Sequence, residues 1–208
     1  MNNLVSRREF AVITTALAGT VSTALAGDDK PPAAKTTSNG PVEAVFERDY
    51  AVPSFKPGWK KPQINRLMVQ DFVIYAHSDL SMTKKLKEKE PALVNAFMDW
   101  GAGDWESALG GASHMGRRDI AEYLLAEGAR IDIFCAAMLG LLDAVKSFLT
   151  LQPKLIDARG PHGFTLHFHA QVGGKASEPV LDYLQSIKHI DMKPNPFLNN
   201  KKDSPAKK

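Results

Sequence analysis

The sequence lacks the residues and motifs of several common site types. Its 208 residues include a single cysteine, Cys135, which excludes a disulfide within the chain. It has no Cys-x-x-Cys and no His-Glu-x-x-His pattern, both typical spacings of zinc ligands. It also has no Gly-x-Ser-x-Gly elbow and no phosphate-binding loop of the Gly-x-x-x-x-Gly-Lys-Ser/Thr type. Because Cys135 lies in an apolar run, we expect it to be buried as a small hydrophobic side chain.

The charges show little excess of one sign and no dense cluster. The chain has 26 Lys and Arg against 23 Asp and Glu, a formal net charge of +3, and the C-terminal lysines supply much of the excess. Without a basic patch there is no surface for a phosphate backbone, so we expect no nucleic-acid partner. With 44% hydrophobic and 24% charged residues, the composition is that of one soluble domain with extensions.

No pair of acids stands in a catalytic context. Asp99 and Asp104 fall in a glycine-rich turn, where solvated carboxylates are the simpler interpretation. We therefore predict a protein without enzymatic activity and without a cofactor.

Residues 1–26 have the pattern of a signal peptide. Ser6-Arg7-Arg8-Glu9-Phe10 precedes an apolar stretch that ends in Ala24-Leu25-Ala26, a small-x-small cleavage pattern. The arginine pair resembles a twin-arginine signal of bacteria, and an ordinary secretory signal is the alternative. Either interpretation predicts export to the periplasm or the cell exterior, with no membrane segment after cleavage. Residues 27–41 show no apolar periodicity and are predicted to be a flexible linker.

Residues 42–62 combine aromatic side chains with prolines and lysines. Phe46, Tyr50, Phe55 and Trp59 make this segment too apolar for a free linker. We expect an irregular strap that packs against the first helices and covers the open end of the helical domain.

The rest of the chain shows repeated pairs of amphipathic segments. In residues 104–132, apolar residues recur at helical spacing on both sides of Gly116. Residues 63–96 contain a similar pair, and the string at 90–96 is repeated at 152–158, each time with a proline that stops a helix. Two short amphipathic helices cannot bury their apolar faces alone, so the pattern favours a stack of helix pairs.

The segment 104–132 resembles an ankyrin repeat. The matching residues are Leu109, Ala112, Gly116, Ile120, Leu124, Leu125, Gly128 and Ala129, while Ser107, Ala108 and Gly110 replace the threonine, proline and histidine of the pattern. A string close to the same pattern begins again at Gly163. The resemblance implies an all-α ankyrin-repeat solenoid of about four helix-pair units over residues 63–190, followed by a disordered basic tail, 191–208.

The connections before the second and third units differ in length. The segment between Asn95 and Leu109 is longer than its counterpart at 157–166, whereas the third unit starts at Asp132 without the β-turn finger of an ankyrin repeat. The chain more narrowly resembles small exported ankyrin-repeat proteins of bacteria, through the strings at Phe55–Lys60, Ala76–Leu80 and Ala158–Gly163. This resemblance implies a fold and an exported context, not a reaction.

Four histidines raise the question of a metal site. The unit alignment places His77 and His114 near the ends of first helices in adjacent units, and therefore near each other. His167 and His169 are two residues apart, a poor chelating spacing on a helix, and His167 matches the ankyrin histidine that hydrogen-bonds to backbone between repeats. We predict no metal site. The alternative function is a metal- or haem-related binding protein that uses His77, His114 and Met115.

The long connection carries two tryptophans in an acidic, glycine-rich finger. Tryptophan is enriched among interface hot spots, and the ankyrin resemblance implies binding through finger tips and first-helix faces. The predicted partner-binding residues are Trp100, Asp104, Trp105, His77, His114 and Met115. For Trp105 we expect instead that the indole packs back on the protein; for Trp100 both interpretations stay open. The sequence thus predicts an exported, monomeric protein–protein interaction module that assists an exported partner protein.

Overall fold

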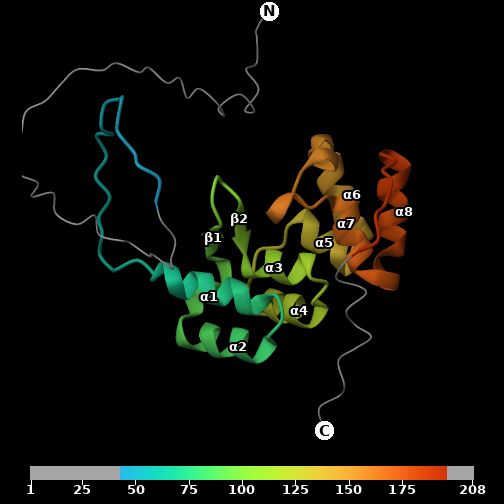
Figure 1. Cartoon of the computed structure of the whole chain (residues 1–208), viewed down its shortest axis with the longest axis horizontal. Helices are drawn as coiled ribbons and strands as arrows, with labels where there is room; N and C mark the ends of the chain where they lie inside the picture. Colours follow the sequence, from blue (N-terminus) through green and yellow to red (C-terminus); the bar gives the residue numbers. More distant parts are fainter. Residues whose placement is uncertain (1–42, 196–208) are drawn as a thin grey trace, which may run out of the picture. The chain divides into compact units, whose positions relative to one another are not determined.

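The structure, a computed structural model, describes residues 43–195. In that range it is mostly helical, with eight α-helices and one small two-stranded sheet (Figure 1). The prediction was an all-α fold; the structure confirms that the fold is mostly helical, and it adds one small sheet. The predicted signal peptide (1–26), the linker (27–41) and residues 196–208 of the predicted tail lie outside the described residues.

The α-helices form four pairs, each joined by a short connection. Their bounds are α1 Arg66–Ala76 and α2 Leu80–Lys89, α3 Ala108–His114 and α4 Arg118–Ala126, α5 Ile133–Leu139 and α6 Leu142–Leu151, and α7 Leu166–Val172 and α8 Glu178–Ile187. This is the number of helix pairs that the ankyrin resemblance implied, about four.

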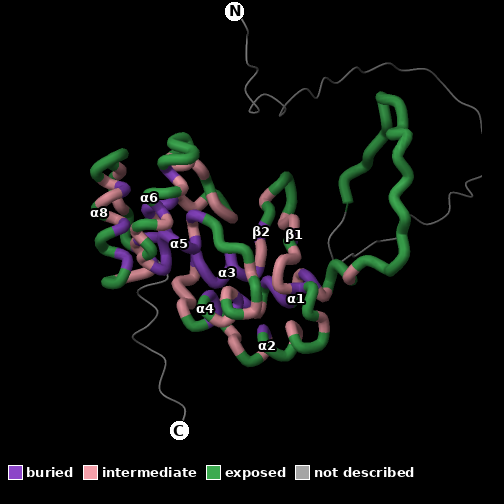
Figure 2. The backbone as a smooth tube through the Cα atoms, turned by 180° about the vertical axis from the view of Figure 1, so that it is seen from behind, coloured by how far each residue is buried: buried purple, intermediate pink, exposed green. Residues whose placement is uncertain are grey.

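The first helices of the four pairs contact one another in chain order. Helix α1 contacts α3, α3 contacts α5 and α5 contacts α7, while each second helix packs on the first helix of its own pair (Figure 1). With a neighbour on both sides, α3 is buried at every residue, and α5 is buried at every residue except Phe134 (Figure 2). Cys135 in α5 is fully buried, as predicted.

Side-chain caps fix where the first helices begin. Asn65, Ser107, Asp132 and Thr165 each accept a hydrogen bond from a backbone N–H in the first turn of the helix that follows. Such a cap contributes about 1 kcal/mol. The cap at Ser107 matters most for the site, because it fixes the point where a β-strand ends and α3 begins.

The repeated string forms the same turn in two places. The 3-10 helix η1 (Pro91–Asn95) follows α2, and η2 (Pro153–Asp157) follows α6. In both places proline, which has no N–H to donate, ends the preceding α-helix. The internal repeat that the sequence predicts is therefore confirmed for the backbone.

A β-hairpin forms the long finger before α3. Strand β1 (Phe97–Asp99) pairs antiparallel with β2 (Trp105–Ser107), with Met98 opposite Glu106. The hairpin carries both tryptophans of the predicted finger, Trp100 in the turn and Trp105 in β2.

The later connections are shorter. Only residues 127–132 join α4 to α5, and they contain no strand, so the third pair lacks a hairpin as predicted. Before α7 the chain forms the short 3-10 turn η3 (Pro161–Gly163), closed by an isolated bridge between Arg159 and Thr165. No hairpin precedes α5, so the η3 turn can reach past the third pair and contact α3 of the second pair.

Two groups of buried apolar side chains form the core. The first lies around α1, α3 and α4, with Phe72, Ile120 and Leu124; the second lies around α6, α7 and α8, with Val145, Leu166 and Leu184. Helix α5 contributes to both groups. Within residues 43–195, no helix has the length and apolar character needed to cross a bilayer.

The predicted strap is irregular but does not show the predicted packing. Residues 43–62 contain no helix or strand, and all of them are exposed (Figure 2). Phe46, Phe55 and Trp59 have exposed fractions of 65%, 78% and 72%. Aromatic residues scattered among prolines do not form one continuous apolar face, so the segment has no single surface to bury. One ion pair, Arg66 with Glu43, joins its start to α1.

Candidate metal centre

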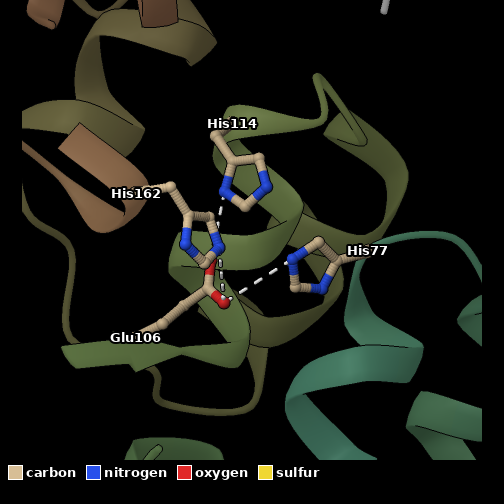
Figure 3. Close-up of side chains that lie close together, drawn as sticks. All are labelled: His77, Glu106, His114 and His162. Carbon is tan, nitrogen blue, oxygen red and sulfur yellow. Dashed lines mark ion pairs between the residues drawn. The ribbon is translucent and has the colours of Figure 1, made fainter. Parts of the chain in front are cut away.

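Four chelating side chains from four separate segments converge on one point (Figure 3). They are His77 directly after α1, Glu106 in β2, His114 at the end of α3 and His162 in η3. One donor atom from each residue lies within 4.8 Å of the other three donors. It is the one group of this kind in residues 43–195.

Strand alternation turns Glu106 towards the interior. Successive side chains of a strand point to opposite faces, so Glu106 shares the inner face with Met98 while Trp105 lies on the outer face. The Glu106 side chain is fully buried, whereas Trp105 is 57% exposed. A strand that buries a carboxylate and exposes an indole reverses the usual preference. Such a local conflict is expected at a functional position.

The three imidazoles surround the Glu106 carboxylate (Figure 3). Glu106 Oε1 lies 3.1 Å from His114 Nδ1, and Oε2 lies 3.6 Å from His77 Nε2 and 3.5 Å from His162 Nε2. Trp100 donates a hydrogen bond from Nε1 to Oε2 at 2.7 Å. Donors around a tetrahedral ion at 2.0–2.1 Å stand about 3.3 Å apart. Each imidazole lies near this distance from one of the two carboxylate oxygens, and the widest separation in the donor set has to shorten by roughly 1.5 Å.

Hydrogen bonds to the second ring nitrogen orient two of the imidazoles. Nδ1 of His77 lies 2.8 Å from the carbonyl oxygen of Val73, and Nδ1 of His162 lies 2.8 Å from Oδ2 of Asp104. A carbonyl or carboxylate oxygen can only accept, so Nδ1 carries the proton in both rings. This tautomer leaves the lone pair on Nε2, the nitrogen that faces Glu106. Metal-binding histidines are generally held by this kind of outer hydrogen bond.

Asp104 also fixes the backbone of the turn that carries His162. Its Oδ1 accepts a hydrogen bond from the His162 N–H at 2.9 Å, in addition to the ring contact of Oδ2. His162 has φ 56° and ψ 19°, the left-handed region, where a non-glycine residue loses about 1–2 kcal/mol. The two contacts with Asp104 stabilise this conformation. We refer to these two contacts as the Asp104–His162 clamp.

Gly111 in α3 makes room for the His77 ring. A Cβ atom at position 111 would lie 2.7 Å from Cε1 and 2.8 Å from Nδ1 of His77, closer than side chains can approach. Glycine in a helix interior is less favourable than alanine by about 1 kcal/mol. The close approach of an imidazole explains why a glycine occupies this buried helical position.

The charge states of the cluster suit metal ligation. Burial alone would raise the pKa of Glu106, but hydrogen bonds and charges from His114, His77 and Trp100 outweigh it and bring the pKa below its ordinary value. Burial lowers the pKa of His77 against the opposing attraction of Glu106. Burial raises the pKa of Asp104, but the hydrogen bonds from His162 outweigh this effect, so the pKa lies below its ordinary value. Ionised carboxylates and a neutral imidazole are the forms that bind metal.

Several residues predicted for partner binding belong to this cluster. His77 and His114, expected to lie near each other, have ring centroids 4.8 Å apart. Trp100 is half-buried and holds Glu106, while Asp104 holds His162. We predicted no metal site and named His77, His114 and Met115 only for the alternative function; the structure brings His77 and His114 together with Glu106 and His162.

Two predicted residues lie elsewhere. Trp105 is exposed on the outer face of the hairpin, so the expected packing of its indole against the protein is not seen. Met115 is the half-buried residue that follows α3, and it is not one of the four donors.

His167 and His169 contact backbone carbonyl oxygens. Nε2 of His167 donates to the carbonyl oxygen of Lys188, and Nδ1 of His169 donates to that of Thr165. Lys188 directly follows α8, so the bond from His167 stays within one helix pair. The ankyrin resemblance implied a bond between pairs, and this detail differs.

Glu106 and His162 were not among the predicted site residues. Glu106 stands between a tryptophan and a helix cap in a segment that was interpreted as a finger for partner binding. His162 lies in a Gly-Pro-His-Gly turn far from the other ligands in the chain. One feature of the sequence could have indicated that His162 joins the site: the third pair has no finger. Without a finger before α5, the turn η3 before α7 can approach the hairpin before α3.

Comparison with known proteins gave no match: no family model, no curated protein and no solved structure is similar to the chain. The site is therefore defined by its own donors, as a cluster of three imidazoles and one carboxylate set among stacked helix pairs.

Proposed function

We propose that this protein binds a divalent transition-metal ion through His77, Glu106, His114 and His162. The observation that carries the proposal is the convergence of these four donors within 4.8 Å around a buried carboxylate. Taking a carboxylate out of water is costly unless compensating groups surround it. A bound cation would compensate the charge of the carboxylate. The Nε2 atoms of His77 and His162 are oriented so that they could bind the same cation.

The donor set favours particular metals. Three imidazole nitrogens and one carboxylate oxygen suit Zn²⁺, Cu²⁺, Ni²⁺, Co²⁺ or Fe²⁺. Ca²⁺ and Mg²⁺ prefer oxygen ligands throughout, and Cu⁺ prefers thiolate or thioether sulfur. Cys135 is buried in α5 and does not belong to the cluster. We expect Cu²⁺ to bind most tightly, because imidazole-rich sites follow the general affinity order of these ions, and a tetrahedral arrangement of the donors to suit Zn²⁺.

The test is a titration of the purified full chain with Zn²⁺ and with Co²⁺, whose visible spectrum reports coordination. The wild-type protein should bind one equivalent, and Glu106→Gln or His114→Ala should lower the affinity at least tenfold. His189→Ala is the matched control, since the His189 side chain is 79% exposed and outside the cluster. Binding of less than a tenth of an equivalent, or ligand variants that bind like the control, would contradict the proposal.

The framework of the site is proposed to be an ankyrin-type solenoid. The contacts of the first helices in chain order, the hairpin in the position of a finger and the repeated 3-10 turns support this assignment. We also propose that the protein is exported, on the signal-peptide pattern of residues 1–26. A reporter fusion of residues 1–26, with and without substitution of Arg7 and Arg8 by lysine, tests export and its route. Retention of the reporter in the cytoplasm would contradict it.

A second candidate function is protein binding through the hairpin, without catalytic activity. Phe97 and Trp105 are each 57% exposed and lie on its outer face, beside a cavity of about 490 Å³ that Arg66 and Trp100 also line. Exposed aromatic side chains next to a concavity are typical of interface anchors. Trp105→Ala tests this function separately from metal binding, since Trp105 is exposed on the outer face of the hairpin and is not one of the four donors. A variant that keeps every partner of the wild-type protein would exclude the hairpin surface.

A further inference from the structure

The four proposed ligands are anchored in two different ways. His77 directly follows α1 and His114 ends α3, and apolar side chains of both helices belong to the first core. Glu106 lies on β2, opposite Met98 of that core. His77 is further fixed by Val73 and Gly111, and Glu106 by Trp100. These three donors form the preorganised part of the site.

His162 is anchored far more weakly. It lies in the three-residue turn η3, which precedes the helix pair of the second core. Its side chain is 35% exposed, compared with 4% for His114 and 0% for Glu106. Outside the four ligands, its ring and its N–H are both held by Asp104, a half-buried residue at the end of the hairpin turn. The ring also lies 6.2 Å from the Phe164 ring and 6.5 Å from the Trp100 ring, centroid to centroid.

We propose that the Asp104–His162 clamp is the gate of the metal centre, a proposal that rests on the function proposed above. His162 is the last ligand to bind an incoming ion and the first to leave. When the clamp opens, the ion stays on His77, Glu106 and His114 and presents a coordination position on the solvent side. No covalent bond changes in this step; one metal–nitrogen contact is exchanged for a contact with water or an external donor.

The chemistry of the clamp explains why Asp104 controls the rate. By accepting from Nδ1, the carboxylate keeps the ring in the tautomer that ligates through Nε2, and it raises the basicity of that nitrogen. By accepting from the backbone N–H, it also holds the left-handed turn. Loss of an outer carboxylate of this kind typically weakens a metal site 10- to 100-fold. Asp104 is therefore a positioning residue, which acts on the metal through His162.

A three-ligand site with an open position is the arrangement that accepts an exchangeable ligand. We expect an external nitrogen donor of the imidazole class to enter at the position that His162 vacates. This property would suit a protein that takes up and passes on its ion, in contrast to a closed four-ligand site that retains it.

The experiment measures metal release from the full chain loaded with one equivalent of Co²⁺ or Zn²⁺. Excess chelator is added in a stopped-flow instrument, and the release rate is compared for wild type, Asp104→Asn and Asp191→Asn. Asp191 is the matched control, because it faces His189 in another aspartate–histidine pair outside the cluster. Asp104→Asn should release the ion about 10 to 100 times faster with unchanged stoichiometry, and Asp191→Asn should match the wild type.

A second arm replaces the ligands themselves. His162→Ala should still bind one ion more weakly, and added imidazole should change its Co²⁺ spectrum and restore part of the affinity. His114→Ala should bind no ion under the same conditions, with circular dichroism confirming that both variants are folded. Free imidazole at the same concentration should change the wild-type spectrum much less, because His162 competes for the same position.

The outcomes separate the two proposals. If the wild-type chain binds no metal, the proposed function and the gate both fail. If it binds one equivalent but Asp104→Asn releases the ion at the wild-type rate, only the gate is overturned. The gate is also overturned if His162→Ala loses the ion as completely as His114→Ala, since all four ligands would then be equivalent.

Discussion

Replacing Gly111 by alanine should separate the metal centre from the fold. The added Cβ would lie 2.7 Å from Cε1 of His77, and ordinary contacts between such atoms begin at about 3.4 Å. The backbone of α3 is buried and packed, whereas the imidazole ends a side chain that is 22% exposed. The ring of His77 therefore has to move by close to 1 Å, and the helix stays in place.

The expected magnitudes follow from this geometry. Metal–ligand distances tolerate about 0.2 Å, so the displaced His77 no longer ligates and the affinity should fall at least tenfold, about 1.4 kcal/mol. The metal-free protein gains about 1 kcal/mol of helix propensity and loses a similar amount by tilting the hydrogen bond to Val73. Its free energy of unfolding should change by less than about 1 kcal/mol.

Gly110→Ala provides the comparison within the same helix. A Cβ at position 110 meets its nearest atom, Cγ of Pro161, at 3.3 Å, which needs an adjustment of only a few tenths of an ångström, and it lies at an ordinary contact distance of 3.5 Å from Cγ of Glu106. Isothermal titration gives the metal affinity and denaturant unfolding without metal gives the stability of both variants. If Gly111→Ala binds Zn²⁺ as tightly as Gly110→Ala, the role of His77 as a ligand is refuted.

Three further predictions concern the rest of the fold. Burial lowers the pKa of His169 to about 4, while the unfolded chain keeps the ordinary value of 6.5. Between these pH values the unfolded state binds more protons than the folded state. The free energy of unfolding should therefore fall by up to about 3 kcal/mol as the pH drops from 6.5 to 4. Of the charged groups near it, His114 lowers this pKa further and Glu106 raises it, and His169→Gln should flatten that part of a urea-unfolding pH series. Burial raises the pKa of the Cys135 thiol to about 12, so a thiol reagent at pH 8 should label the unfolded protein and leave the folded protein unlabelled over the same minutes. Leu124→Ala removes a fully buried side chain from the first core and should lower the free energy of unfolding by about 2–5 kcal/mol, in contrast to Leu151→Ala at an 81% exposed position.

The helices were predictable because their signals are local. Apolar spacing in α4, the prolines at 91 and 153 and the glycine-rich turn of the hairpin each act on neighbouring residues. The row of first helices also followed from the repeat, since one pair cannot bury its own apolar face. The exposure of residues 43–62 was not predictable in the same way, because the aromatic content of a segment does not determine which surface of the protein it contacts.

The site was predictable only in part. The similar positions of His77 and His114 in adjacent units were visible in the unit alignment, and their rings do meet. The inward direction of Glu106 depends on which face of a three-residue strand is buried, and the strand is too short to show alternation. The place of His162 depends on a contact between loops on either side of the third pair, and no local pattern encodes it.

Because the third pair has no finger, the length of the connection at residues 127–132 decides whether the proposed metal ligands can meet. A hairpin in front of α5 would stand between Asp104 and His162, because α5 lies between α3 and α7 in the row. An insertion in residues 127–132 would thus separate the two parts of the cluster while every proposed ligand and every helix remained unchanged. In a protein built from stacked pairs, a binding site can be gained or lost through a change in loop length at a position that touches none of its atoms.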